Sequence, residues 1–143
     1  MFNYAKKILA IKKLFRGFEV KTVKLQEPNS LGERQRVFTR LVADLIIFAY
    51  SHGYELTFGE TYRPLATAEL YAMEGIGLKN SLHTKKLAVD FNLFKDGKYL
   101  SSNNAHEFLG EFWESLSFGN VSCCWGGRFG DGNHYSISYR GKK

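Results

Sequence analysis

The spacing of apolar residues predicts a long helix near the start of the main part of the chain. Its stripe consists of Phe38, Leu41, Leu45, Ile46 and Ala49, at the spacing of one helix face. Ser30 and Glu33 form an S-x-x-E capping box before this stripe, and Gly53 follows it as a C-terminal stop signal. We therefore expect a helix between Ser30 and Gly53.

The apolar period then changes to two, which is typical of strands. In "YELTFGETYR" the apolar residues Tyr54, Leu56 and Phe58 alternate with Glu55, Thr57 and Gly59. In "LAVDFNLF" one face carries Leu87, Val89, Phe91 and Leu93, and the other carries Ala88, Asp90, Asn92 and Phe94. The first face of this second strand predicts a core face, so Asp90 points away from the core.

The remaining elements alternate irregularly. We expect a short helix after Pro64, a hairpin turn at 95–98 ("KDGK"), a helix over about 104–116, and strands around 121–125 and 134–138. A chain of 143 residues is most simply one globular domain. These patterns predict an α+β domain over residues 25–143, with a small, mainly antiparallel sheet packed by helices.

The net charge of +6 comes from the first residues alone. Residues 1–24 hold seven basic side chains and one acidic one, whereas residues 25–143 are neutral overall. The apolar residues of this segment, Tyr4, Ile8, Ile11, Phe15 and Phe18, form one helical stripe. It is either an anchor to an anionic wall or membrane surface or to a partner groove, or a helix docked on its own domain. A stripe differs from the stacking platform of a nucleic-acid binder, so we expect no nucleic-acid partner.

The cysteines and the apolar runs bear on where the protein is made. Cys123 and Cys124 are neighbours, whose spacing does not suit a disulfide, so we expect a reducing compartment. The longest apolar run, around Leu45–Tyr50, is far too short to span a bilayer, and "MFNYAKKILAIKKLF" lacks the features of a secretory signal. We expect synthesis in the cytoplasm without a signal peptide.

Two segments carry residues suited to metal chemistry. His83 comes just before the strand that holds Asp90, and "WGGRFGDGNH" holds Asp131 and His134 in a glycine-rich turn. Two histidines and one carboxylate suit Zn²⁺ and leave a fourth position for water. Asp131 lies beside His134 in sequence, where it can take a proton from that water. Each residue alone also has a structural interpretation, and the combination is what favours a site.

The two segments resemble the motifs of a known family. They read S-x-H-x-x-x-x-A-x-D (Ser81, His83, Ala88, Asp90) and W-G-G-x-F-x-D-x-x-H (Trp125, Gly126, Gly127, Phe129, Asp131, His134), and "GETYRP" upstream is similar to the family's Y-R element. The family is that of zinc peptidases that cleave bacterial cell-wall peptides. It includes D-alanyl-D-alanine carboxypeptidases and dipeptidases and phage L-alanyl-D-glutamate endolysins. The likeness covers about residues 30 to 140.

This resemblance implies a role for each matched position. His83, Asp90 and His134 would bind one Zn²⁺ per chain, and Asp131 would be general base and then proton donor. Arg63 would stabilise the oxyanion or a substrate carboxylate, the alternative being a salt bridge to Glu60 or Glu69. Ser81, Tyr62 and Trp125 would support the ligands or contact substrate. Lys86 stands where the family usually has glycine, so the turn after His83 is expected to differ, and Lys86 is a candidate contact for an acidic substrate.

The function that the resemblance implies is hydrolysis of peptidoglycan stem peptides by a monomeric zinc enzyme. A phage-type L-alanyl-D-glutamate endopeptidase that reaches the wall after release is the first choice. The alternatives are a D-alanyl-D-alanine carboxypeptidase and a non-catalytic binding or virion module that keeps the zinc fold. His52, His106, Cys123 and Cys124 are assigned no part in the site; both histidines are expected at the surface, Cys123 and Cys124 in core packing and on the sheet surface.

Overall fold

The computed structural model describes residues 23–143. The predicted amphipathic helix of residues 1–24 lies almost wholly outside this range, so its two interpretations stay predictions. No helix within residues 23–143 combines the length and the apolar character needed to cross a bilayer.

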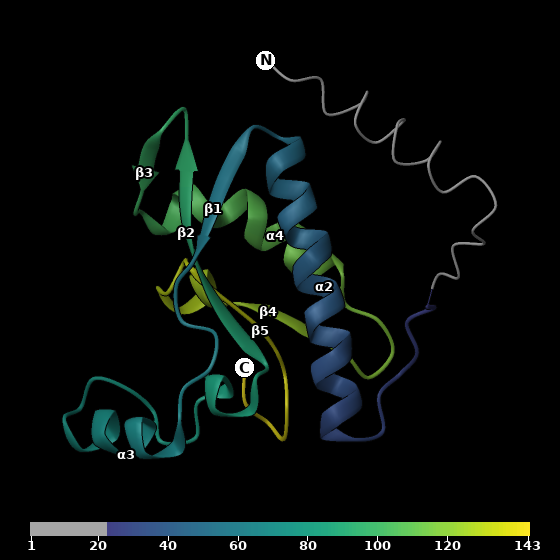
Figure 1. The fold of residues 1–143 in the computed structure, drawn as a ribbon, viewed down its shortest axis with the longest axis vertical. Coiled ribbons are helices and arrows are strands. Elements are labelled where there is room, and N and C mark those ends of the chain that lie inside the picture. Colours follow the sequence, from purple (N-terminus) through teal and green to yellow (C-terminus); the bar gives the residue numbers. More distant parts are fainter. Residues whose placement is uncertain (1–22) are drawn as a thin grey trace, which may run out of the picture.

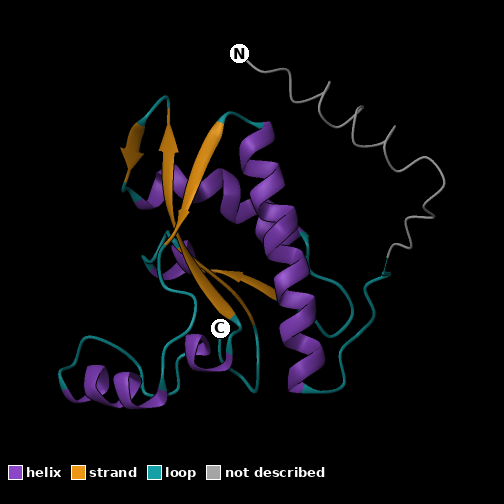
Figure 2. Cartoon of the chain, viewed as in Figure 1, coloured by secondary structure: helices purple, strands orange, loops and turns teal. Residues whose placement is uncertain are grey.

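The elements follow one another in the irregular order that the sequence predicts (Figure 2). The helices are α2 (Leu31–Ser51), α3 (Leu65–Met73) and α4 (Glu107–Ser115). Three short 3₁₀ turns are η1 (Leu82–Lys85), η2 (Asn103–His106) and η3 (Gly126–Phe129). The strands are β1 (Tyr54–Phe58), β2 (Ala88–Lys95), β3 (Lys98–Leu100), β4 (Cys123–Trp125) and β5 (His134–Ile137).

The five strands form one open sheet in the order β1-β2-β5-β4, with β3 paired to β2, and every pair is antiparallel. Helices α2 and α4 pack on each other and on the sheet, whereas α3 projects away from both (Figure 1). The α+β fold class is thereby confirmed. β2 is the central element, because it pairs with three strands and contributes to both halves of the sheet.

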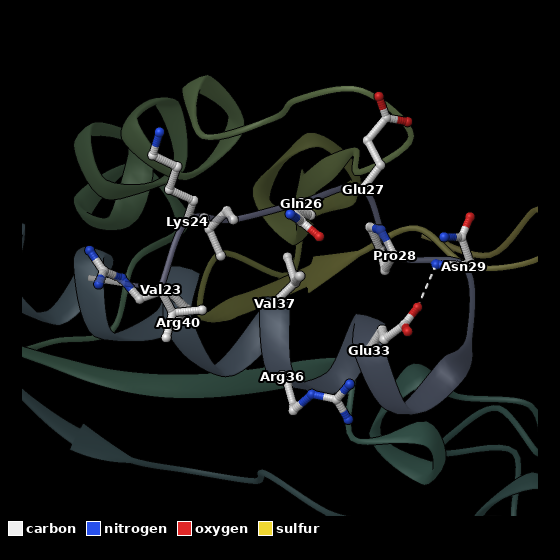
Figure 3. Close-up of a pocket in the computed structure, with 11 residues that line it drawn as sticks. Val23, Lys24, Gln26, Glu27, Pro28, Asn29, Glu33, Arg36, Val37 and Arg40 are labelled. Atoms are coloured by element: carbon white, nitrogen blue, oxygen red, sulfur yellow. Dashed lines mark hydrogen bonds between the residues drawn. The ribbon is translucent and has the colours of Figure 1, made fainter. Parts of the chain in front are cut away.

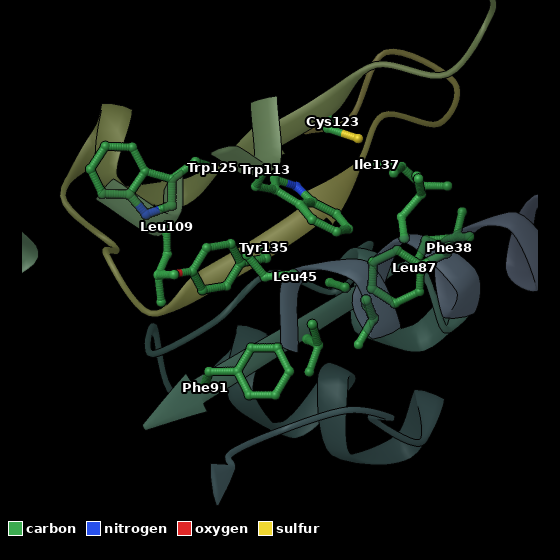
Figure 4. Packing of buried hydrophobic residues seen from close by; sticks show 14 of the residues in the cluster. Phe38, Leu45, Leu87, Phe91, Leu109, Trp113, Cys123, Trp125, Tyr135 and Ile137 are labelled. Carbon is green, nitrogen blue, oxygen red and sulfur yellow. The ribbon is translucent and has the colours of Figure 1, made fainter. Parts of the chain in front are cut away.

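The core lies between the sheet and helices α2 and α4 (Figure 4). Leu87 and the inward residues of β2, Val89, Phe91 and Leu93, are at most 2% exposed, which confirms the predicted core face. The Trp113 ring of α4 meets the Phe38 ring of α2 edge-on at 5.9 Å between centroids. The opposite face of β2, which carries Asp90, is therefore the face free to build a site.

The local signals at the element ends also hold. The Ser30 hydroxyl accepts from the Glu33 N–H at 3.2 Å, and the Glu33 carboxylate accepts from the Ser30 N–H at 3.1 Å, so the capping box is formed. At the β2–β3 hairpin Asp96 and Gly97 both adopt positive φ, as the "KDGK" turn predicts. Cys123 is buried, Cys124 is half-buried, and both are free thiols.

Two expectations about single segments are wrong. The strand in "YELTFGETYR" ends at Phe58, and residues 59–63 continue as an extended connection instead. His106 is 2% exposed, with its Nδ1 3.0 Å from the Tyr135 hydroxyl oxygen, whereas a surface position was expected. The 3₁₀ turn η2 starts this helix region and directs His106 inward, where burial lowers its pKa.

The larger cavities do not coincide with the predicted chemistry. A groove of about 690 Å³ lies between residues 23–29 and α2, and Glu33, Arg36, Val37 and Arg40 of the helix line it (Figure 3). The Asn29 N–H donates to the Glu33 carboxylate at 2.8 Å there, which ties this segment to the start of α2. The groove contains no histidine or cysteine, so it offers no site for the chemistry that the sequence predicts.

Candidate metal centre

His83 is positioned by a short 3₁₀ turn with its own cap. The Ser81 hydroxyl accepts from the backbone N–H of His83 at 3.3 Å, so Ser81 fixes the start of η1. The carbonyl of His83 accepts from the N–H of Arg63 at 3.3 Å. Hydrogen bonds thus hold the backbone of His83 at both its N–H and its carbonyl. The His83 side chain is 3% exposed.

Lys86 occupies the left-handed backbone region directly after this turn. Its φ and ψ are 55° and 41°, and its N–H donates back to the carbonyl of His83 at 3.2 Å. Glycine reaches this region without the cost that a Cβ brings. Lys86 therefore takes, with a Cβ, a backbone conformation that glycine takes at lower cost. The Lys86 Nζ lies 5.1 Å from the centre of the Tyr62 ring.

Asp90 and His134 are brought together by sheet register. They are directly opposite each other in the antiparallel pairing of β2 with β5, so their side chains share one face. The residues that follow β1 also fix the backbone of Asp90. Its N–H donates to the Glu60 carbonyl, and its carbonyl accepts from the N–H of Gly59, both at 2.8 Å. Strand pairing thus brings Asp90 and His134, which are 44 positions apart in sequence, next to each other.

Two glycines let the loop before β5 fold closely onto η3. A Cβ on Gly126 would lie 2.3 Å from the carbonyl oxygen of Asp131, and one on Gly127 would lie 2.0 Å from the Trp125 ring. The Trp125 indole N–H donates to the Gly132 carbonyl at 2.7 Å from a buried position. The W-G-G sequence therefore shapes the loop that carries Asp131 and His134.

Three donor atoms converge where these segments meet. The Nε2 of His83 lies 3.2 Å from the Nδ1 of His134 and 3.3 Å from the Oδ1 of Asp90, and the last two atoms are 3.0 Å apart. Burial alone would raise the pKa of Asp90, but hydrogen bonds from His134 and His83 outweigh it and lower that pKa to about 2. Asp90 is accordingly an ionised carboxylate beside two imidazoles.

The spacing of these atoms fits a metal ion. Donors about 2.0–2.1 Å from a tetrahedral Zn²⁺ are separated from one another by about 3.3 Å, close to the three distances observed. Two imidazole nitrogens and one carboxylate oxygen are also ligands that Zn²⁺ prefers, and three protein ligands leave one position open. His83, Asp90 and His134, hereafter the triad, can therefore hold Zn²⁺.

Most of the other predicted residues surround the same cavity. A cavity of about 220 Å³ has the triad, Arg63, Ser81 and Asp131 in its lining, together with Ile76, Leu78 and Phe129. Asp131 is exposed, and within residues 23–143 no hydrogen bond or ion pair reaches its carboxylate. Tyr62 and Trp125 are placed elsewhere. Tyr62 lines a separate cavity with Lys86, and Trp125 is buried in the core.

Arg63 forms the salt bridge with Glu60 that the sequence offered as one interpretation, and it lies at the cavity of the triad. The sequence indicates Glu60 only as one of two possible salt-bridge partners for Arg63. Its i,i+3 spacing in "ETYR" was the available signal, but a spacing does not reveal that the pair lies at a cavity.

The arrangement defines what each group can do. A bound Zn²⁺ would supply Lewis acidity and an open coordination position. The Asp131 carboxylate can accept a proton from a water that attacks a carbonyl and return it to a leaving amine. The Arg63 guanidinium can donate hydrogen bonds to a carbonyl or carboxylate oxygen. Together these groups form a site suited to hydrolysis of a polar carbonyl compound.

Comparison with known proteins agrees with the architecture. The fold is similar to that of the Serratia marcescens L-Ala D-Glu endopeptidase ChiX, with a TM-score of 0.60 over 85% of this chain and 97% of that one. The two sequences are 15% identical, so the likeness concerns the fold. No protein-family model and no curated protein sequence matches the chain.

Proposed function

We propose that this chain is a zinc-dependent peptidase that hydrolyses the stem peptides of bacterial peptidoglycan, and that it cleaves the bond between L-alanine and D-glutamate. The observation that carries the proposal is one cavity lined by a metal-binding triad, a carboxylate and a guanidinium. The sequence motifs and the fold similarity to an L-Ala D-Glu endopeptidase support the same activity independently.

The same cavity favours an enzyme over a binding module. Structural zinc sites are closed by four protein ligands, whereas the triad supplies three. A binding module also has no need for a carboxylate such as Asp131 beside the ligands. Cleavage of a terminal D-alanyl-D-alanine bond is the alternative activity, which the fold similarity favours less.

The test is digestion of purified peptidoglycan by the zinc-loaded protein, followed by identification of the new termini. We expect new amino-terminal D-glutamate residues and no products after chelation. Release of free D-alanine would identify the alternative carboxypeptidase activity. The enzymatic proposal fails if neither bond is cut with zinc present.

The basic segment of residues 1–24 enters the proposal as an anchor to an anionic wall or membrane surface. Its charge is attractive to such a surface, and the rest of the chain is neutral. Removing these residues should leave hydrolysis of a soluble stem peptide intact and weaken lysis of intact cells. Loss of both activities would show instead that the segment belongs to the catalytic fold.

A further inference from the structure

Arg63 is held in an ion pair beside the triad. Its Nε donates to the Glu60 Oε1 at 2.8 Å, and its Nη2 donates to the Glu60 Oε2, so two parallel hydrogen bonds form a fork. The Arg63 guanidinium also lies 5.1 Å from the centre of the Tyr71 ring. The Arg63 side chain is 13% exposed and that of Glu60 28%, so the pair is largely shielded from solvent.

The backbone of this pair is tied to two of the three proposed ligands. The Glu60 carbonyl accepts from the N–H of Asp90 at 2.8 Å, and the N–H of Arg63 donates to the carbonyl of His83 at 3.3 Å. Residues 59–63 therefore run between Asp90 and His83 as a short strap. A guanidinium fixed to this strap keeps a constant position relative to the triad.

The fork with Glu60 does not use all the donors of Arg63. A guanidinium has five N–H groups, and Glu60 takes two of them. Within residues 23–143 no further acceptor bonds the guanidinium, and Arg63 lines the cavity of the triad. Its Nη1 lies 3.4 Å from the place a Cβ on Gly77 would take, so the absence of a side chain there leaves room beside it. The remaining N–H groups are available to a molecule in the cavity.

We propose that Glu60 is a positioning residue, which holds Arg63 so that its unused N–H groups bind a carbonyl or carboxylate oxygen of the peptide substrate. This role rests on the proposed peptidase function. A free arginine side chain has many rotamers, and fixing one of them before substrate arrives removes an entropic cost from binding and from the transition state. The pairing also keeps Glu60 ionised, since the hydrogen bond from Arg63 lowers its pKa.

The test is a double-mutant cycle on a soluble stem peptide with the full-length, zinc-loaded protein. Glu60→Gln removes the charge at nearly constant shape, and we expect kcat/KM to fall about tenfold with unchanged zinc content. Arg63→Ala should cost about 100-fold, and adding Glu60→Gln to it should cost nothing more. Glu69→Gln is the matched control, because Glu69 pairs with Lys79 at the surface and should leave kcat/KM unchanged.

The outcomes separate this role from a structural one and from the function itself. Glu60→Gln within twofold of wild type, or losses that multiply in the double variant, would overturn the positioning role. If Glu60→Gln does not fold, Glu60→Asp tests the same point, because a shorter carboxylate should give a partial loss with zinc bound. A wild-type protein that cuts no stem peptide removes the proposed function and this role together. An active wild type with an equally active Glu60 variant removes only the role of Glu60.

Discussion

The sheet, which carries Asp90 and His134 of the triad, and the lobe around α3 differ in how much of their apolar surface is buried. Here the α3 lobe means residues 64–80. Leu87, the inward residues of β2 and the Tyr135 ring are almost fully buried, whereas Ala68 is the buried residue of α3. Apolar side chains of the lobe are instead exposed, among them Leu70, Met73, Ile76 and Leu78 at 46%, 79%, 68% and 73%.

The difference in burial suggests that the sheet and the lobe contribute differently to the site. Two of the triad's ligands are strand residues above a packed core, so their positions are set by the fold. Ile76 and Leu78 of the lobe line the same cavity from a segment with little burial of its own. Rigid elements hold reactive groups well, and exposed segments are where contacts to a partner molecule are commonly made. We therefore expect the sheet to determine catalysis and stability and the lobe to determine substrate affinity.

The largest effect should come from removing a ligand on the sheet. His134→Ala deletes one of three donors, so we expect loss of stoichiometric zinc and loss of peptidoglycan hydrolysis. Metal analysis of the purified variant measures the first and the digest measures the second. His52→Ala, at the exposed end of α2, is the control and should retain both. A His134 variant with full zinc content would contradict the ligand assignment.

The next effect separates chemistry from metal binding. Asp131→Asn keeps the shape of the side chain but removes the base, so turnover should fall by about two orders of magnitude or more. Zinc content should stay at one per chain. The matched control is Asp44→Asn, which breaks an exposed pair with Arg40 on α2. Wild-type turnover in the Asp131 variant would exclude it from the mechanism.

A pair of substitutions compares the two regions directly. Leu78→Ala in the lobe should change the free energy of unfolding by less than about 0.5 kcal/mol and raise KM several-fold. Leu87→Ala, in the core just before β2, should cost about 2–5 kcal/mol, because it leaves a cavity in a fully buried position. Denaturant unfolding and steady-state kinetics on both variants give the comparison. Equal destabilisation would show that the lobe is part of the core.

The smallest effect concerns the turn between lobe and sheet. Lys86 has a positive φ, which is strained for a residue with a Cβ. Lys86→Gly removes this strain, so the free energy of unfolding should rise by up to about 1 kcal/mol. Hydrolysis should be unchanged, because Lys86 lines the cavity with Tyr62 and not that of the triad. Thermal unfolding measures the gain. A loss of activity would mean that Lys86 contacts substrate after all.

Much of this fold was predictable because local signals agreed with burial. The Ser30 capping box, the alternation in β2 and the "KDGK" turn each act within a few residues, and all three are present. The inward turn of His106 was not predictable, since it depends on how η2 packs against Tyr135. Phe58 was expected on the alternating apolar face of its strand but is 60% exposed.

For the site, too, the sequence indicates the residues but not their contacts across the fold. Sequence spacing identified the residues of the triad, but not the strand register that sets Asp90 opposite His134. It left Arg63 between a salt bridge and a place in the site, because spacing cannot show that one geometry provides both. Nor could it place Tyr62 and Lys86 at a separate cavity. Contacts between distant segments decide each of these points.

The most direct test of the metal centre is anomalous diffraction at the zinc absorption edge from crystals of the zinc-loaded protein. We expect one anomalous peak within bonding distance of the Nε2 of His83, the Nδ1 of His134 and the Oδ1 of Asp90. A peak bound by other residues, or no peak after zinc loading, would contradict this expectation.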